Sequence, residues 1–394
     1  MQELVGYNSN HMKSRNRGIA LQLIAGEKLS RAELTKRMGL SKMAITKIAN
    51  ELMEYGYVVE GSTEETAGAG RNPTQLEISP TAPIALGVYL SRNELSVMLG
   101  SLTLETLYRA SLPLVDENAD TLTEKLFALC DGATAFAASL PCTGILGIGV
   151  SAIGPVDPEG GRLLHPTNFF GISDYPIGRL LGERYGLPVF CDNDMNASAV
   201  CEKLYGVGRQ TDHFIYFGIT NGIGAGIISD GKLCRHGSVS CGEIGHMSIR
   251  FDGPRCTCGN RGCLEVYANM PVILRKLEVK IGQPVSPADL PALAENPRCE
   301  GVFSETLDYL CVALVNAANI LDPGCIVIGH EGAFLPDSFL AALGERVNGG
   351  ILSSGYQSVE VVRSTFGDRA PDLGSVSLVF EMLFSGQLQN EKAE

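Results

Sequence analysis

The chain has 394 residues, which is long enough for two or three domains with substantial hydrophobic cores. Its formal net charge of -13 argues against a protein whose whole surface binds nucleic acid, but the charge is unevenly distributed along the chain. Residues 1–50 contain nine Lys or Arg against three Glu, a net charge of +6, so the other 344 residues carry -19. A basic head on an acidic body indicates a localised contact with nucleic acid, although charge alone leaves a solvated basic surface without a partner open.

The N-terminus is polar, and no apolar run approaches the ~18–20 residues needed to cross a bilayer. Nine of the twelve cysteines are scattered among apolar neighbours, which is typical of buried free thiols in a reducing compartment rather than of a disulfide framework. We therefore expect a soluble, cytoplasmic protein without membrane insertion.

Residues 30–53 predict a helix-turn-helix. Ser30 and Glu33 have the spacing of a capping box, which starts a helix that runs to about Met38 and ends at Gly39. Ser41 is placed to cap a second helix, and two helices joined by a short glycine turn are typical of this motif. The second helix is expected to turn five side chains inward: Met43, Ile45, Ile48, Leu52 and Met53.

The other face of this second helix is expected to contact DNA, the N-terminal side chains at base edges and the lysines at phosphates. The side chains on this face are Ser41, Lys42, Ala44, Thr46, Lys47 and Asn50. Residues 57–60 and 74–78 alternate like the strands of a hairpin, which predicts a wing with Arg71 at its tip, able to enter a minor groove. A helical hairpin that serves only dimerisation is the alternative, but the wing and the basic charge favour DNA binding.

The body of the chain has an α/β pattern, because apolar strand-like runs alternate with helical stretches and Gly-rich turns. Such runs occupy residues 84–90, 145–150, 189–191, 214–219 and 325–328. The segment from Asp192 to Asn196 follows one of these strands and opens a helix expected to begin at Ala197. Amide and carboxylate side chains at strand ends suit a polyol, whose hydroxyl groups both donate and accept hydrogen bonds, but helix capping explains them equally well.

Residues 243–265 contain one imidazole and three thiols within eighteen residues, a complete tetrahedral ligand set for zinc. The four ligands are His246, Cys256, Cys258 and Cys263. A site with four protein ligands is structural, and it would hold the flanking Glu243 and Glu265 at the mouth of an adjacent cavity. The alternative is that these four residues are unrelated to one another.

The frame Glu-x-Gly-His followed by Cys-x-Cys-Gly-x-x-Gly-Cys-x-Glu resembles the signature of the ROK family, which contains bacterial repressors and sugar kinases. The resemblance extends over nearly the whole chain and is greatest to the xylose-repressor-like regulators. It implies an N-terminal winged helix-turn-helix at residues 1–79, followed by a two-lobed, actin-like (ribonuclease H-like) α/β fold. The implied first lobe spans 80–196 and is completed by about 370–394, and the second spans 197–369 with its zinc loop at 246–263.

The resemblance also implies a sugar site in the cleft between the lobes. In ROK proteins the residues at the matching positions contact the sugar, and the histidine serves zinc and sugar with one ring nitrogen each. The matching residues here are Asn168, Asn193, Asp194, Glu243, His246 and Glu265. In the kinases of the family the residue at Asp194 is the general base that activates a sugar hydroxyl.

The phosphate-binding half of the kinase site is altered. ROK kinases have Asp-x-Gly-Gly-Thr at the first strand, where this chain has Tyr89, Ser91, Arg92 and Asn93 at the four defined positions. Loss of the Mg²⁺-side carboxylate and of both glycines predicts a chain without catalytic residues, in which Asp194 is a relic base. The loop 220–226 keeps its glycines and is expected to be a plain strand-to-strand turn, while residues 328–332 read Ile-Gly-His-Glu-Gly in place of a Gly-Gly run.

These features predict a sugar-responsive repressor with structural Zn²⁺, whose dimer or tetramer binds palindromic operator DNA and is released by a monosaccharide effector. Two alternatives remain open. One is a ROK-type sugar kinase that phosphorylates a hexose with ATP and carries a DNA-binding head, and the other is a regulator controlled by a protein partner.

Overall fold

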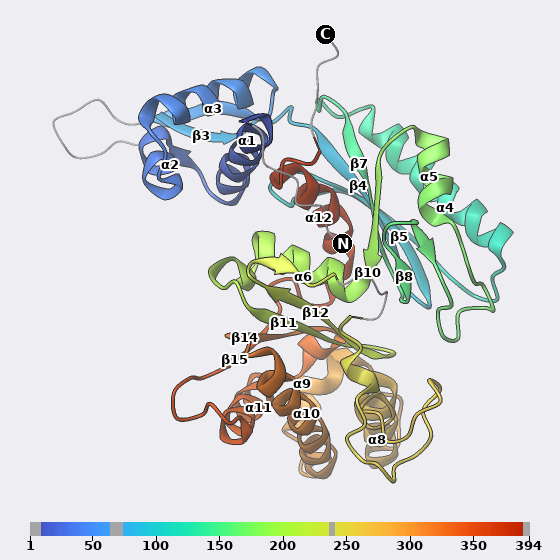
Figure 1. Cartoon of the computed structure of the whole chain (residues 1–394). Coiled ribbons are helices and arrows are strands. Elements are labelled where there is room, and N and C mark those ends of the chain that lie inside the picture. Colours follow the sequence, from blue (N-terminus) through green and yellow to red (C-terminus); the bar gives the residue numbers. More distant parts are fainter. Residues whose placement is uncertain (1–8, 64–73, 236–240, 389–394) are drawn as a thin grey trace.

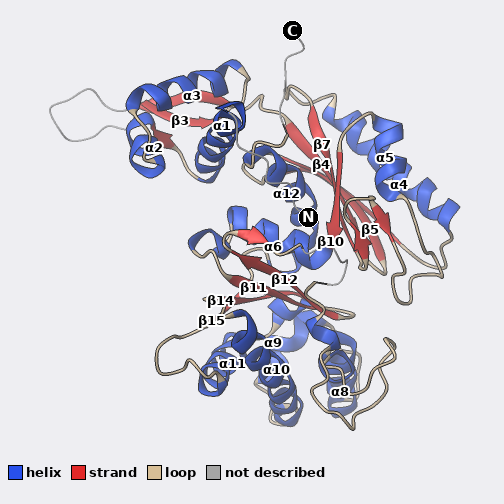
Figure 2. Cartoon of the chain, in the orientation of Figure 1, coloured by secondary structure: helices blue, strands red, loops and turns tan. Residues whose placement is uncertain are grey.

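The computed structural model describes residues 9–63, 74–235 and 241–388, which form a head beside two five-stranded α/β sheets (Figures 1 and 2). Most buried apolar side chains gather in three clusters, two of which are centred on the individual sheets. The third cluster runs from the helices of the head onto the C-terminal helix of the chain. Among the described residues, no helix combines the length and apolar composition needed to cross a membrane.

The head, described at residues 9–63 and 74–78, contains three helices and a three-stranded antiparallel sheet in the order β1-β3-β2. Its elements are α1 (Ser9–Gly26), β1 (Leu29–Ser30), α2 (Arg31–Met38), α3 (Lys42–Glu54), β2 (Val58–Thr63) and β3 (Thr74–Ile78). The predicted capping box is present, since the Ser30 hydroxyl accepts from the backbone N–H of Glu33 and Glu33 accepts from that of Ser30 at 2.8 Å. Gly39 ends α2 with a φ of 64°, and Ser41 caps α3. The tip between the strands, with Arg71, lies outside the described residues.

The inward face predicted for α3 is wrong at Met43. Ile45 and Leu52 are buried as expected, and Ile48 and Met53 pack against the core, but Met43 is 82% exposed. Residues two positions apart on an α-helix are separated by roughly 200° around its axis, so Met43 and Ile45 cannot both face the core.

The first sheet has the strand order β10-β7-β4-β5-β6, with β10, β7 and β4 parallel and the last two strands antiparallel. Helices α4 (Ala119–Ala137) and α5 (Ile177–Tyr185) lie along it, and a small hairpin of β8 (Val156–Asp157) and β9 (Arg162–Leu163) precedes α5 (Figure 1). The strands are β4 (Ile84–Leu90), β5 (Glu94–Gly100), β6 (Thr106–Pro113), β7 (Ile145–Ala152) and β10 (Val189–Asn193).

The second sheet repeats this plan in the order β13-β12-β11-β14-β15, with β11, β14 and β15 parallel. Its strands are β11 (Phe214–Ile219), β12 (Ile223–Ser229), β13 (Lys232–Leu233), β14 (Cys325–His330) and β15 (Glu360–Arg363). Its helices are α6 (Asp194–Tyr205), α7 (Glu265–Ala268), α8 (Met270–Ile281), α9 (Leu290–Ala294), α10 (Glu300–Leu321) and α11 (Asp337–Gly350). The turn between β11 and β12 is the plain strand-to-strand connection that the glycines of 220–226 predict.

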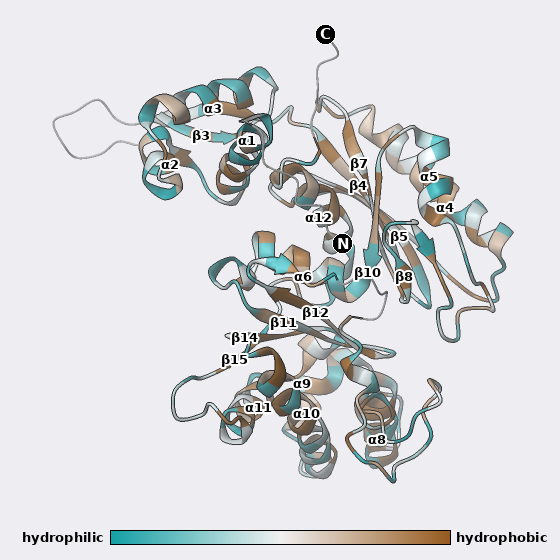
Figure 3. Cartoon of the chain, viewed as in Figure 1, coloured by the Kyte–Doolittle hydropathy of each residue, from teal (hydrophilic) through white to brown (hydrophobic). Residues whose placement is uncertain are grey.

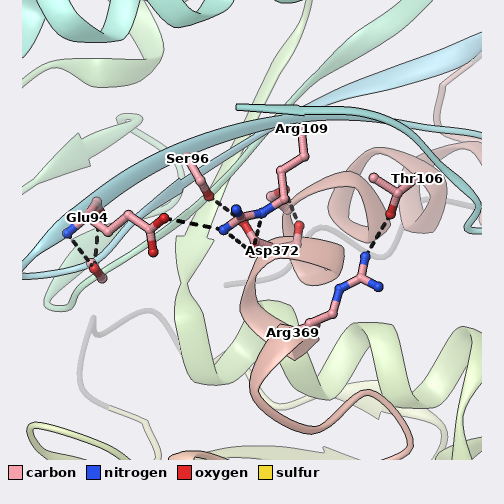
Figure 4. Close-up of polar contacts among 8 residues, drawn as sticks. Glu94, Ser96, Thr106, Arg109, Arg369 and Asp372 are labelled. Carbon is pink, nitrogen blue, oxygen red and sulfur yellow. Dashed lines mark hydrogen bonds and ion pairs between the residues drawn. The ribbon is translucent and has the colours of Figure 1, made fainter. Parts of the chain in front are cut away.

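Helix α12 (Ala370–Phe384) packs on the first sheet, although it follows every strand in the chain. Glycine in the sheet permits this close approach: a Cβ at Gly149 would lie 1.7 Å from the carbonyl oxygen of Ser375. Figure 4 shows the polar contacts at the start of the helix, where Asp372 accepts from Ser96 and from Arg109 Nη2 at 3.0 Å. Nearby, Arg369 donates to Thr106 at 2.8 Å. These contacts attach α12 to β5 and β6.

The other end of α12 contacts the head. A Cβ on Gly18 of α1 would lie 2.1 Å from the carbonyl oxygen of Phe384, so the two backbones touch. Helix α12 also packs along α6 of the second sheet. One helix therefore contacts the head, the first sheet and the helix that opens at the candidate sugar residues.

Candidate functional site

A cavity of about 400 Å³ lies where the two sheets approach each other. Its wall comes from the β4–β5 loop, the β8 region, the β10–α6 junction, the β11–β12 turn and the segment before the cysteine cluster. Five of the six predicted sugar residues line it, namely Asn193, Asp194, Glu243, His246 and Glu265.

Asn168 is the exception. Its side chain is exposed, its φ is 54°, and it is not among the residues that line the cavity, whereas its neighbours His165 and Thr167 are. The predicted loop therefore reaches the cavity, through residues one and three positions before the expected one.

The β10–α6 junction brings Asn193 and Asp194 into the cavity. Helix α6 begins at Asp194, three residues earlier than expected, because Asn193 caps it by accepting from the backbone N–H of Asn196 at 2.8 Å. The side-chain oxygen of Asn193 is thus used by the helix cap, as the helix-capping explanation of this residue expects. The N–H groups of its side-chain amide remain available as donors. Asp194 accepts from the backbone N–H of Met195 at 3.0 Å, so the helix start fixes its carboxylate at the wall.

A buried histidine supports Asp194 from behind. His330, at the end of β14, places its Nε2 3.6 Å from Asp194 Oδ2, while its Nδ1 lies 3.1 Å from the Tyr216 hydroxyl. That hydroxyl also accepts from the backbone N–H of His330 at 3.1 Å, so Tyr216 fixes the position of the imidazole behind Asp194. Sequence reasoning noted the histidine only as an interruption of a glycine run and missed this contact.

Glu243 and Glu265 give the cavity an acidic wall. Glu265 starts α7 and accepts from the backbone N–H of Ile223 at 3.2 Å, which orients its carboxylate. Burial raises the pKa of the Glu243 carboxyl, and the carboxylates of Glu265 and Asp194 raise it further, against a lowering effect of His246. Carboxylates crowded in this way gain from ligand hydroxyl groups that donate to them.

The four predicted metal ligands come together beside the cavity, with their ligand atoms all within 4.8 Å of one another. The Cys258 and Cys263 sulfurs are 3.7 Å apart, and Cys256 Sγ lies 3.6 Å from His246 Nδ1. Zn–S bonds of about 2.3 Å at tetrahedral angles place two sulfurs roughly 3.8 Å apart, so the cluster has the dimensions of a zinc site. Burial raises the pKa of the Cys263 thiol to about 12, a penalty on its thiolate that a bound divalent cation would offset.

His246 lies between the cluster and the cavity. Its Nδ1 faces Cys256, its Nε2 lies 4.0 Å from Glu243 Oε2, and the residue is part of the cavity wall. The two ring nitrogens therefore face Cys256 and Glu243 separately.

The end of β4 and the β4–β5 loop form part of the cavity wall. Tyr89, Ser91 and Arg92 line the cavity, and the Ser91 hydroxyl closes the turn by accepting from the backbone N–H of Glu94 at 3.0 Å. Burial raises the pKa of the Tyr89 hydroxyl well above its usual range, and the charge of Asp194 adds to this, so Tyr89 is neutral at this wall.

The DNA face predicted on α3 is open to solvent. Ser41, Lys42, Thr46, Lys47 and Asn50 are exposed, and Ala44 is half-buried. Sequence reasoning missed Met43 on this face, because an apolar residue near a helix start was assigned to the core.

Comparison with known proteins gives relatives along the whole chain. The ROK family profile matches residues 85–382. The xylose repressor of Caldicellulosiruptor bescii is 29% identical over 96% of this chain and 98% of that protein, and the DNA-binding transcriptional repressor Mlc of Escherichia coli is 26% identical over 96% of both.

The solved structures agree. A ROK family transcriptional regulator, a homologue of Escherichia coli Mlc, superposes with a TM-score of 0.79 at 28% identity, over 96% of this chain and 98% of that chain. A ROK hexokinase from Thermus thermophilus matches with a TM-score of 0.64 at 26% identity, over 76% of this chain and 99% of its own. These likenesses confirm the expected α/β, actin-like fold, and the profile match over most of the chain shows that the protein belongs to the ROK family.

Proposed function

We propose that this chain is a DNA-binding transcriptional repressor that a monosaccharide releases from its operator. The observation that carries the proposal is one cavity in which Asn193, Asp194, Glu243, His246 and Glu265 meet, in a chain that also has a basic head with an exposed, capped second helix. The relatives named as repressors match the chain over its head as well as its body, which supports the same function.

The cavity is proposed to bind a monosaccharide through its hydroxyl groups. Asp194, Glu243 and Glu265 accept from the hydroxyls, and the amide of Asn193 and Nε2 of His246 complete the set with donors. Asn168 is proposed to contact the sugar from the rim of this site, since its loop contributes His165 and Thr167 to the wall.

The cavity is proposed to bind sugar without phosphorylating it. Phosphoryl transfer depends on positioning the triphosphate and neutralising its charge with Mg²⁺. Here Tyr89 presents a neutral phenol where a carboxylate is needed, and Arg92 fills space that a glycine would leave to phosphate. His330 Nε2 lies 3.6 Å behind the relic base Asp194, a surrounding that suits a binding carboxylate.

The Cys/His cluster is proposed to hold a structural Zn²⁺ with four protein ligands, His246, Cys256, Cys258 and Cys263. The ion would supply no chemistry to a ligand. Its contribution would be to hold the loop that carries Glu243 and the start of α7 at Glu265, so that both carboxylates keep their place in the wall.

The head is proposed to bind DNA as part of a homodimer or tetramer. Two heads would meet a palindromic operator with half-sites about one helical turn apart, using the exposed face of α3 and Arg71 of the wing. The proposed domains are 1–79 for the head, 80–196 with 370–394 for the first lobe, and 197–369 for the second.

A gel-shift titration of the full chain on the DNA upstream of its own gene, alone and with a panel of monosaccharides, tests the proposal. Binding lost with one sugar supports it and identifies the effector. Binding that no sugar changes favours a regulator under the control of a protein partner. No specific binding, together with ATP-dependent phosphorylation of a sugar, favours a kinase and refutes the proposal.

A further inference from the structure

The exposed face of α3 contains one large apolar side chain among polar ones. Met43, the second residue of the helix, is 82% exposed. It lines a shallow groove of about 620 Å³ with Thr46, Lys47 and Asn50, which follow it by three, four and seven residues and so share its side of the helix. Glu51 and Glu54, towards the C-terminal end of the helix, also line the groove.

The position of Met43 on the helix points to base edges. In a helix-turn-helix, the N-terminal residues of the second helix enter the major groove, and residues further along meet the backbone. Helix α3 lies at the outer edge of the head, and its main described contacts are with α1, α2 and β2 (Figure 1). The rest of the molecule therefore leaves this helix start free to enter a groove.

The polar neighbours of Met43 are already partly committed. The Thr46 hydroxyl donates to the backbone carbonyl of Lys42 at 2.8 Å, and Lys47 lies 4.0 Å from Glu51. Asn50 is exposed and able to pair with an adenine edge. Because Thr46 and Lys47 are engaged as described, few polar groups beside Met43 are left to read bases. Met43 itself offers no hydrogen bond, and its flexible, polarisable chain adapts to an apolar surface.

We infer that Met43 recognises the 5-methyl group of a thymine in the major groove of the operator. This methyl is the only apolar group that a base pair presents there, and apolar side chains read thymine through it. The inference rests on the proposed DNA-binding function, which it deepens by naming a residue and the chemical group that it reads.

Deoxyuridine tests the inference, because it pairs like thymine and lacks only the methyl. The full chain first selects its preferred duplex from a randomised pool, and each thymine of that duplex is then replaced singly by deoxyuridine. We expect one replacement in a half-site to weaken binding by the wild-type chain about fourfold, the value of one buried methyl group. Met43→Ala should bind the thymine duplex more weakly and lose sensitivity at that position, while Met43→Leu should keep it.

Met12→Ala is the matched control, since Met12 is a 58%-exposed methionine of the same head on α1. It should leave the uridine scan unchanged. The inference is overturned if no thymine is sensitive, or if Met43→Ala keeps the wild-type pattern, as it would if this face met a protein. Failure to select any duplex would instead refute the proposed function, so the two failures are distinguishable.

Discussion

Arg235 Nε donates to Asp192 Oδ2 at 2.8 Å, and this pair lies directly behind the candidate sugar site. Asp192 is almost fully buried and precedes Asn193, and it also accepts from the Asn196 amide at 2.7 Å. The other side of the same guanidinium donates to Glu381 of α12 at 3.1 Å. Because the end of α12 touches α1, this arginine joins the β10–α6 junction to the helix that supports the head.

The first prediction concerns Glu381→Gln, which weakens the link to α12 and leaves the buried Asp192 with its arginine. Sugar affinity should stay within about twofold of the wild type, because the cavity wall is unchanged. The effect of sugar on operator binding, typically about 5- to 150-fold in coupled systems, should fall severalfold.

Operator titrations with and without sugar, beside calorimetry of sugar binding, measure the two quantities separately. Glu300→Gln, an exposed change on α10, is the control and should alter neither. An undiminished sugar effect in Glu381→Gln would exclude this route between cavity and head.

The second prediction concerns the metal cluster. Cys258→Ser should remove most bound zinc and lower the melting temperature, because three ligands rarely hold a structural ion as four do. It should also abolish the sugar response, since Glu243 and Glu265 lose their support. Elemental analysis and thermal unfolding test this, with Cys311→Ser, a cysteine outside the cluster, as the control. A zinc-free variant that still answers to sugar would contradict the role given to the metal.

The third prediction concerns His330. Its side chain is almost fully buried, so His330→Asn should lower the melting temperature modestly, because the smaller side chain fills the same space incompletely. Loss of the imidazole, whose Nε2 lies 3.6 Å from Asp194 Oδ2, should weaken sugar binding severalfold, because the carboxylate loses the group packed behind it. Calorimetry measures the affinity, and unchanged sugar binding would show that His330 only fills space.

The fourth prediction separates binding from catalysis at Asp194. Asp194→Asn removes an acceptor from the cavity, so it should reduce sugar affinity at least tenfold while operator binding without sugar stays at the wild-type level. Coupled-enzyme assays should find no ATP-dependent phosphorylation by either chain. Turnover by the wild type that disappears in Asp194→Asn would instead establish a kinase.

Local patterns in the sequence predict those parts of the molecule that local interactions determine. The capping box at Ser30, the cap at Ser41 and the strands at 84–90 and 214–219 depend on neighbours within a few residues, and each was predicted where it occurs. The clustering of the four candidate metal ligands was likewise predicted from spacing alone, because three of them lie within eight residues.

Contacts between distant segments were not predictable in this way. His330 and Asp194 are 136 positions apart in the sequence, and Arg235 and Glu381 are 146 apart. The hydrophobic periodicity of a single helix or strand therefore cannot predict either contact. Met43 was misassigned for a different reason. Hydrophobicity near a helix start usually marks the core, and here that expectation outweighed the helical phase, which places Met43 opposite Ile45.

The place of α12 in the chain has a consequence for synthesis. The strands of the first sheet leave the ribosome long before residues 370–384, and until then the sheet face that α12 covers exposes its glycines and apolar side chains to water. The head can form its capped helices early from local contacts, yet the surface that supports α1 arrives with α12. A nascent chain therefore acquires the connection between its head and its cavity only at the end of folding, after each part has taken shape by itself.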